Sequence, residues 1–366
     1  MKQLEIVKSA LAEMENWHES RHLLVGFDGF VDEIIHVVDT RKNPGEFQRI
    51  ATIKAFSDRI ASAAGLSANI ELVTTQIKLG GNGPIMANAL IEQGFEVTYM
   101  GALGKNTIHP VFNEFAENCK RVISLANPGR TDALEFLDGK IMLGKIDLAD
   151  VSFEKLLDKI SARELESLLS EVSLIAFTNW TMLSNLNSIL VEFGKVMAGL
   201  KKKPLVFIDL ADPKKRTTED IKEVLKLISE LPCKTVLSMN LSESTTISLA
   251  LGIKAEDLVE RASLIRQEMG IEAIVIHPVN GAAVSHTQES AWIDGPYTAK
   301  PKLTTGAGDN FNAGFCNAWI GGLSLAKCLA VGVCSSGYYV RNAKSAKRKE
   351  LVDFMGLWVK ADCKVV

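Results

Sequence analysis

The sequence LTTGAGDNFNAG, at Leu303 to Gly314, joins a Gly-x-Gly turn to the start of a helical pattern. The first N–H groups of a helix have no partner within it, and the helix dipole adds about half a positive charge at that end. The glycines let a ligand approach the backbone closely. The turn at Gly306, Ala307 and Gly308 therefore predicts an anion site suited to phosphate. Asp309 follows in the first helical turn, either as a helix-stabilising acid or as a base beside a reacting phosphate.

Short apolar runs rich in β-branched residues alternate with longer helical patterns along much of the chain. Continuously apolar strands separated by helices of this length are typical of βαβ units with a buried parallel sheet. The predicted fold class is α/β, doubly wound. The expected strands lie at residues 22–26, 96–100, 174–177, 205–209, 235–239 and 273–277, and the expected helices at 84–93, 162–169, 187–200, 218–230 and 255–269.

A second group of strand patterns interrupts this alternation. The patterns lie at residues 31–40 and 69–78, on either side of a helical insert at 52–64, and at 131–137 and 140–147, around the hairpin signal Asp138-Gly139. They predict a small sheet outside the main one, which either closes over a pocket as a lid or forms an edge hairpin with no gating role. Because the sequence shows no repeat or linker, we expect a single domain over residues 1–366, with lid strands at about 31–40, 69–78 and 131–147.

The charges nearly cancel: 41 basic and 44 acidic residues leave a formal net charge of −3 over 366 residues. A nucleic-acid or anionic-membrane partner would favour a basic surplus, so neither is expected. The start of the chain lacks a cationic segment followed by an apolar run, and no apolar stretch reaches the ~18 residues of a membrane helix. We expect a cytoplasmic protein. None of the six cysteines forms a Cys-x-x-Cys pair, which makes zinc improbable.

Two loops supply polar groups that suit a polyol. Leu79 to Asn88 reads LGGNGPIMAN, in which Gly80 and Gly81 permit close backbone approach and Asn82 offers an amide that donates and accepts. The alternative is a well-capped turn.

The other loop, Gly26 to Asp32, reads GFDGFVD and follows an apolar strand. Ligands of open α/β sheets bind beyond the carboxyl ends of strands, where Asp28 and Asp32 could hold sugar hydroxyls. The alternative is a solvated acidic loop.

Asn240 and Glu243 follow the strand expected at residues 235–239. An amide and a carboxylate at this spacing could hold Mg²⁺ through its water shell. They could equally form a capping box at a helix start, and the pattern alone favours the capping box.

In this order and spacing, the four segments resemble the ribokinase (PfkB) family of carbohydrate kinases, from about Leu23 to Ala343. The most specific piece is TTGAGDNFNAGF at Thr304 to Phe315, which is similar to the family's C-terminal signature. Gly80-Gly81 matches the N-terminal signature, and the segment Asn240 to Glu243 matches the family's Asn-x-x-Glu element.

The resemblance implies a three-layer α/β/α sandwich with a small β-sheet lid, and ATP-dependent phosphorylation of a sugar or sugar-like alcohol. Asp309 would act as general base, and the amides of residues 306–308 would form the anion hole. The resemblance also implies a homodimer formed through the lid as a possible assembly. The implied binding residues are Asp28, Asp32, Gly80, Gly81 and Asn82 for the sugar, Thr305, Gly281 and Asn240 for the nucleotide, and Asn240 with Glu243 for Mg²⁺ through water.

The sequence departs from the family pattern at several positions. Leu303 stands where the signature usually begins with Asp, and an aliphatic side chain cannot ligate potassium, so potassium activation is not expected. His277-Pro278 replaces a usual Thr-Leu-Gly, which leaves Gly281 as the match on the nucleotide side. Asp212, in a segment that resembles an Asp-rich strand end of the family, is a further candidate site residue.

Two other functions remain open from the sequence. A nucleoside kinase of the same fold would want an aromatic or broad apolar wall near the Gly-Gly loop, and none can be assigned there. A catalytically silent sugar- or nucleotide-binding regulator would have no chemical need for Asp309, Asn240 and Glu243.

Overall fold

The computed structural model describes residues 3–17, 19–145 and 148–364. Its body is built on a nine-stranded sheet with the order β14-β13-β12-β11-β10-β9-β1-β5-β6. The strands from β6 to β12 run parallel, and β13 and β14 add an antiparallel edge. The strands are β1 (His22–Phe27), β5 (Glu96–Gly101), β6 (Arg121–Ser124), β9 (Leu174–Thr178), β10 (Leu205–Asp209), β11 (Thr235–Met239), β12 (Ala273–Ile276), β13 (Gly281–His286) and β14 (Ser290–Asp294).

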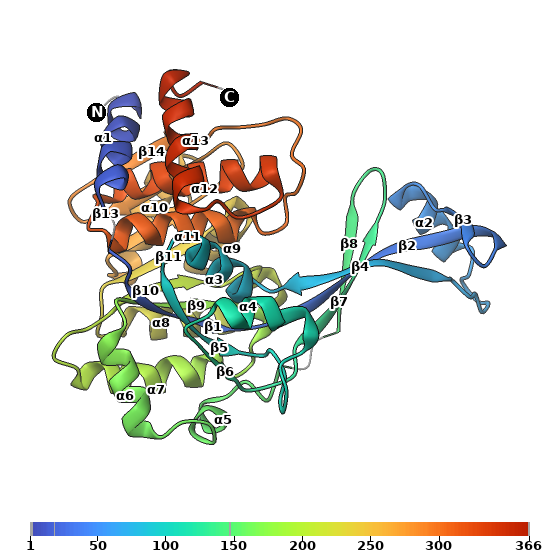
Figure 1. Cartoon of the computed structure of the whole chain (residues 1–366), viewed down its shortest axis with the longest axis horizontal. Helices are drawn as coiled ribbons and strands as arrows, with labels where there is room; N and C mark the ends of the chain where they lie inside the picture. Colours follow the sequence, from blue (N-terminus) through green and yellow to red (C-terminus); the bar gives the residue numbers. More distant parts are fainter. Residues whose placement is uncertain (1–2, 18, 146–147, 365–366) are drawn as a thin grey trace.

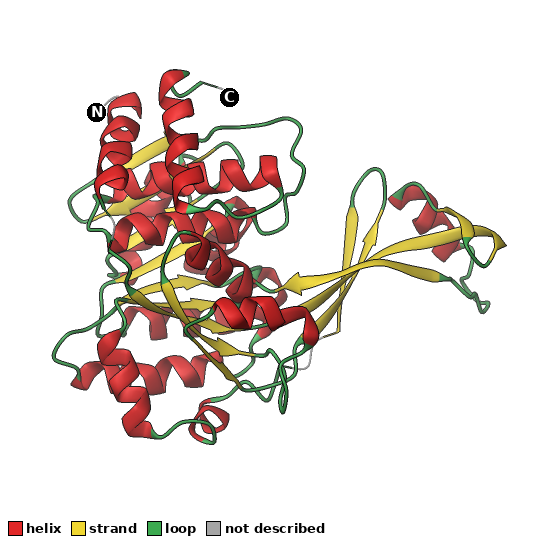
Figure 2. Ribbon diagram, viewed as in Figure 1, coloured by secondary structure: helices red, strands yellow, loops and turns green. Residues whose placement is uncertain are grey.

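Helices cover both faces of this sheet (Figures 1 and 2). Successive residues of a strand point to opposite faces, so Leu23 and Val25 join one apolar core while Leu24 joins the other. The first face is covered by α1 (Gln3–Asn16), α3 (Asn82–Glu92), α4 (Asn113–Asn118), α11 (Ala307–Ile320), α12 (Leu325–Asn342) and α13 (Arg348–Lys360). The second is covered by α5 (Phe153–Leu157), α6 (Ala162–Glu171), α7 (Leu186–Gly199), α8 (Thr218–Ser229), α9 (Leu241–Leu251) and α10 (Leu258–Met269). Three short 3-10 helices are η1 (Pro110–Phe112), η2 (Trp180–Met182) and η3 (Pro213–Lys215).

A five-stranded sheet extends away from the body (Figure 1), and we call it the projecting sheet. Its central strand β2 pairs with β3, β4 and β7, and β7 pairs with β8. Near its outer end, the helix α2 (Ile53–Ala61) contributes Phe56 to a small separate core with Ile35 and Val37. The strands are β2 (Phe30–Asn43), β3 (Glu46–Arg49), β4 (Leu72–Gly80), β7 (Gly129–Glu135) and β8 (Lys140–Lys145).

The predicted α/β fold is confirmed, and all six expected strands of the main sheet occur within one residue of their predicted ends. The helix expected from residue 255 begins only at Leu258, because the Asp257 side chain accepts a hydrogen bond from Glu260 N–H and caps the helix there. Strands occur in each predicted lid segment, while residues 146–147, at the end of the third segment, lie outside the described residues. Within the described residues, no helix is long and apolar enough to cross a membrane.

Candidate active site

The parallel strands end at one edge of the main sheet, and a polar residue stands at the end of five of them or directly after it. This edge is where open α/β sheets bind ligands. The residues are Asp28 after β1, Asn179 after β9, Asp209 at the end of β10, Asn240 after β11 and His277 after β12.

Two helices begin at the same edge and bring distant segments together. The side-chain amide of Asn82, the first residue of α3, donates a hydrogen bond from Nδ2 to Oδ1 of Asp309 over 2.9 Å. Asp309 lies in the first turn of α11 and is 5% exposed. The glycine loop and the glycine turn quoted from the sequence therefore form one site.

Asp28 is completely buried and holds the start of α3 in place. Its carboxylate accepts hydrogen bonds from the N–H groups of Asn82 (3.0 Å) and Gly83 (2.8 Å) and from Asn179 Nδ2 (2.6 Å). A Cβ on Gly83 would lie 2.7 Å from Oδ1 of Asp28, so this close approach requires glycine. Burial raises the pKa of Asp28 to about 6, although the three donors oppose the shift. Asp28 therefore acts on the site indirectly, by holding the loop at Asn82 and Gly83 in place.

Asp32 lies on β2 with its carboxylate packed over Gly80. A Cβ at position 80 would stand 2.4 Å from the carboxyl carbon, which explains the glycine there. Lys78 is opposite Asp32 on β4. Burial raises the pKa of Asp32, while a hydrogen bond from Thr131 and the charges of Lys78 and Lys140 oppose the shift.

Three buried carboxylates gather around the start of α11. Burial, followed by the charge of Asp209, raises the pKa of Asp309 well above its usual value. Burial and the same neighbour raise the pKa of Glu243 to about 9. Asp209 accepts hydrogen bonds from Ala211 N–H (2.8 Å) and from Asn312 Nδ2 (2.6 Å), yet burial still raises its pKa. The cluster concentrates negative charge that a cation would offset.

This cluster fits a cation held through water. The capping box at the start of α9 is formed, because Asn240 N–H donates to Glu243 (2.8 Å) and Glu243 N–H donates to Asn240 (3.0 Å). Across the described ranges, no three His, Cys, Asp or Glu side chains are grouped to hold a metal directly. Carboxylate and amide oxygens are ligands that suit Mg²⁺, which usually keeps several of its waters.

The turn before α11 exposes backbone donors. Gly306 has a φ of 91° and caps the helix. Ala307 N–H donates to the Thr304 carbonyl (3.1 Å), whereas the amides of Gly306 and Gly308 donate to no backbone carbonyl in the part of the chain that the structure describes. Two amides of the predicted anion hole are therefore available, and the third becomes available if its bond to Thr304 opens.

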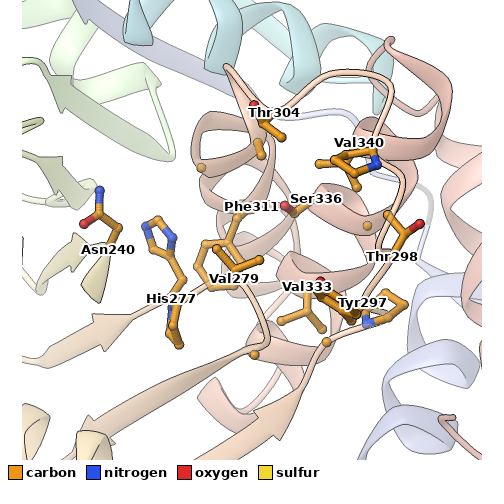
Figure 3. Close-up of a pocket in the computed structure, with 18 residues that line it drawn as sticks. Asn240, His277, Val279, Tyr297, Thr298, Thr304, Phe311, Val333, Ser336 and Val340 are labelled. Carbon is orange, nitrogen blue, oxygen red and sulfur yellow. The ribbon is translucent and has the colours of Figure 1, made fainter. Parts of the chain in front are cut away.

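A cavity of about 280 Å³ opens on one side of this turn (Figure 3). We call it the nucleotide-side cavity. Its walls are largely apolar, and it is lined by Asn240, His277, Pro278, Val279, Gly281, Gly295, Pro296, Tyr297, Thr298, Pro301, Thr304, Ala307, Gly308, Phe311, Val333, Ser336, Gly337 and Val340. Few convergent polar groups in an apolar wall are typical of a small-molecule site.

A second cavity of about 390 Å³ lies on the other side of the turn. We call it the acceptor-side cavity. Asp32 and Lys78 line it from the projecting sheet, and Ile85 lines it from α3. Leu303 and Thr305 line it from the segment before the turn, so Thr305 lies on this side while its neighbour Thr304 lines the nucleotide-side cavity.

The structure also brings in residues that the sequence did not single out. Asp209, the last residue of the strand expected at residues 205–209, is the acid whose charge contributes most to the raised pKa of Asp309. Asn179, with a φ of 61°, supports Asp28, and Asn312 supports Asp209. An acid at the end of an apolar strand was the available signal for Asp209, but the two amides carry no comparable motif.

Comparison with known proteins identifies the family of the chain. The family model for prokaryotic ketohexokinase matches residues 3–357. A ketohexokinase from Haloferax volcanii is 26% identical over 339 residues, which cover 91% of this chain and 90% of that protein.

Solved structures share the fold at lower identity. Ribokinase from Thermotoga maritima is 15% identical, with a TM-score of 0.63, and the match covers 93% of this chain and 100% of that one. Arabidopsis thaliana ribokinase complexed with ribose and ATP is 17% identical, with a TM-score of 0.63 and coverages of 92% and 99%. Phosphofructokinase-2 from Escherichia coli, in complex with substrates and products, is 12% identical, with a TM-score of 0.63 and coverages of 93% and 99%.

The resemblance to the ribokinase family that was stated from the sequence is thereby confirmed, including its ATP-dependent carbohydrate kinase activity. The chain belongs to the prokaryotic ketohexokinase family.

Proposed function

We propose that this enzyme transfers the terminal phosphoryl group of ATP to a hydroxyl of a ketohexose. The observation that carries the proposal is the contact between Asn82 and Asp309, which joins a polyol-binding loop to the helix start suited to phosphate. The family supplies the sugar class, since its relative from Haloferax volcanii is a ketohexokinase.

Asp309 is proposed as the general base. Phosphoryl transfer demands mainly alignment and charge stabilisation, and the acceptor proton must leave to a nearby group. The buried carboxylate has a raised pKa, which makes it a stronger proton acceptor once it is ionised. The N–H groups of Gly306 and Gly308, joined by Ala307 if its bond to Thr304 opens, would stabilise the charge on the transferred group.

The acceptor is proposed to bind between the glycine loop and the projecting sheet. Asp32 and the amide of Asn82 would hydrogen-bond its hydroxyls, since carboxylate and amide groups fix polyols through directed contacts. Gly80 and Gly81 keep the backbone close to these groups. Asp28 would contribute by holding the loop, because its carboxylate is already occupied by three donors.

ATP is proposed to occupy the nucleotide-side cavity, with Gly281 and Asn240 in its wall. Thr305, which the resemblance assigned to the nucleotide, lines the acceptor-side cavity instead. Asn240 and Glu243 would hold Mg²⁺ through water. When bound, Mg²⁺ offsets phosphate charge. Leu303 offers no ligand for potassium, so we propose that activity does not depend on it.

The projecting sheet is proposed to act as a lid over the acceptor. Asp32 and Lys78 connect it to the acceptor-side cavity. Ile77 and Leu143, on its strands, are 55% and 47% exposed, and the strand register places both side chains on the same face of the sheet.

A second copy of the chain could cover that face, and we propose a homodimer formed through the projecting sheet. Sedimentation of the wild type and of a variant with Ile77→Lys and Leu143→Lys tests the dimer, and equal masses for the two proteins would contradict it.

The substrate proposal is tested by ADP release with a panel of ketohexoses, aldohexoses, pentoses and nucleosides. The expected result is the highest kcat/KM with a ketohexose. A preference for nucleosides or pentoses of about tenfold or more in kcat/KM would contradict the proposed acceptor.

A further inference from the structure

The phenol of Tyr339 holds the glycine turn from the side of the acceptor. Tyr339 lies near the end of α12, is 8% exposed and lines the acceptor-side cavity. Its hydroxyl donates a hydrogen bond of 2.9 Å to the carbonyl oxygen of Thr305. No backbone N–H of the described residues donates to this carbonyl, so the hydroxyl of Tyr339 takes the place of a backbone partner.

The contact fixes the orientation of a whole peptide group. The Thr305 carbonyl and the Gly306 N–H belong to the same peptide bond, which is planar and trans, so the two groups point in opposite directions. Because Tyr339 holds the carbonyl on the acceptor side, the Gly306 N–H is directed to the other side of the turn, where the nucleotide-side cavity opens. This N–H donates to no backbone carbonyl in the described part of the chain, so it is available to an anion.

The packing around the hydroxyl matches this role. A Cβ on Gly306 would lie 2.8 Å from the Tyr339 hydroxyl oxygen, so the phenol packs directly against the Cα of a residue with a φ of 91°. The next peptide group is held in a similar way, because Asn310 donates from its side chain (2.9 Å) and from its backbone N–H (3.0 Å) to the Gly306 carbonyl. Residues of α11 and α12 thus fix two successive peptide planes of the turn.

The hydroxyl of Tyr339 remains a donor near neutral pH. Burial, followed by the charge of Asp309, raises the pKa of Tyr339 to about 12. A phenol with this pKa stays protonated at neutral and mildly alkaline pH. The hydrogen bond to Thr305 is therefore kept over that range.

We propose that Tyr339 is a positioning residue for phosphoryl transfer, which holds the Thr305 carbonyl and so turns the Gly306 N–H toward the transferred phosphoryl group. The inference rests on the proposed anion hole at residues 306–308 and adds a group that sets its geometry. Donors that are fixed in advance toward developing charge stabilise the transition state without reorganisation during the reaction. Without the hydroxyl, the peptide group is free to rotate, and the N–H no longer points where charge develops.

Two substitutions separate the hydroxyl from the ring. Tyr339→Phe removes only the hydroxyl, and Tyr339→Leu also removes the ring, so the difference between them measures packing. Tyr338→Phe is the matched control, because it removes a hydroxyl from the neighbouring residue of the same helix, whose ring packs against Phe354 of α13. Loss of one hydrogen bond should lower the Tm of Tyr339→Phe by only about 2–4 °C.

The kinetics are measured with the best acceptor of the sugar panel, whichever sugar that is. Calorimetry measures binding of ADP with and without aluminium fluoride, which mimics the transferred phosphoryl group. We expect Tyr339→Phe to lower kcat by about tenfold and to weaken the complex with ADP and aluminium fluoride by a similar factor. KM for ATP and the affinity for ADP alone should change by less than about twofold, and Tyr338→Phe should match the wild type throughout.

A wild-type kcat in Tyr339→Phe would overturn the inference. Equal losses of affinity for ADP alone and for ADP with aluminium fluoride would also overturn it, because they would show a general disturbance of the cavity. A loss of kcat in Tyr339→Leu alone would assign Tyr339 to packing and would contradict a role for its hydroxyl.

Gly306→Ala distinguishes this inference from the anion hole on which it rests. A wild-type kcat in both Gly306→Ala and Tyr339→Phe would refute the anion hole and the inference together. A loss of kcat in Gly306→Ala with a wild-type kcat in Tyr339→Phe would refute only the role of Tyr339. Because the test uses the best acceptor found, failure of the ketohexose proposal would leave it intact.

Discussion

The amide of Asn82 donates a hydrogen bond to the carboxylate of Asp309 across 2.9 Å, although 227 positions separate the two residues in the chain. The contact connects the start of α3 with the start of α11. It stabilises the ionised form of a carboxylate whose pKa is otherwise raised by burial and by Asp209. The two signatures quoted from the sequence are therefore energetically linked.

Replacement of Asn82 by Ala should reduce the ionised fraction of Asp309, the proposed general base. Loss of the donor raises the pKa of Asp309 further, so less of the carboxylate is ionised and the acidic limb of the kcat–pH profile moves to higher pH. We expect kcat near neutral pH to fall by about tenfold or more. Asn118→Ala, at an exposed position at the end of α4, is the control. An unshifted profile with wild-type kcat would contradict the role of this contact.

Asp28→Asn should change how stability depends on pH. The pKa of Asp28 is about 6 in the folded protein against 3.8 for a free side chain, so the folded state binds this proton more tightly. The stabilisation of the folded state by this tighter proton binding is complete below about pH 4 and declines as the pH rises through 6. On acidification from pH 7 to pH 5, the wild type should therefore gain on the order of 1 kcal/mol relative to Asp28→Asn. Urea unfolding of both proteins at the two pH values measures the difference in the free energy of unfolding. A decrease for the wild type relative to Asp28→Asn on acidification would contradict the raised pKa of Asp28.

Glu243→Gln separates capping from metal binding. Glutamine can still accept the hydrogen bond from Asn240 N–H, so the capping box should be kept. Its NH2 group cannot accept the bond that Asn240 Nδ2 donates to Glu243, so a small decrease of the melting temperature without Mg²⁺ is expected. Bound Mg²⁺ favours the ionised form of Glu243, which glutamine cannot supply, so the Mg²⁺ concentration for half-maximal activity should rise by about tenfold. Asp220→Asn, in the capping box of α8, is the matched control and should leave the Mg²⁺ requirement unchanged. Equal Mg²⁺ curves for wild type and Glu243→Gln would show that Glu243 serves only as a cap.

Gly306→Ala tests the geometry of the turn. Alanine is strained at a φ of 91°, and its Cβ would lie 2.8 Å from the Tyr339 hydroxyl. Displacement of the turn should lower kcat by on the order of 10²-fold. Gly65→Ala is the control, because its φ is 77° and no atom lies within 4 Å of the added Cβ. It should lose about 1 kcal/mol of stability at most and keep wild-type kcat. Comparable losses of kcat in Gly306→Ala and Gly65→Ala would show that backbone strain at any glycine lowers activity, and would contradict a specific role for the turn.

The sequence predicted the main sheet well because its strands are continuously apolar and end at polar residues. Residues 205–209 and 235–239 form strands with the predicted ends. The antiparallel edge at β13 and β14 was not expected, because Gly281–His286 consists largely of small residues and shows no strong strand pattern. Burial there comes from packing against α10 and α12, which a local pattern does not show.

The site was predictable only where a motif marks it. Asp309, Asn82 and Asn240 were predicted as site residues because each follows a recognisable turn or strand. Asp209 affects the site through Asp309, which is distant from it in the sequence, so no local pattern marks it. The roles of Asp28 and Asp32 also differ in a way that the sequence does not show, because three donors occupy the first carboxylate and the second lines the acceptor-side cavity.

The proposed role of Asp309 is tested most directly by the kinetics of Asp309→Asn, with Asp158→Asn, at the exposed C-cap of α5, as a surface control. Asparagine keeps the shape of the side chain but cannot accept the proton. The account predicts that kcat falls by at least about 100-fold while KM for ATP and for the sugar changes by less than about threefold. A kcat within about threefold of the wild type would contradict Asp309 as the base.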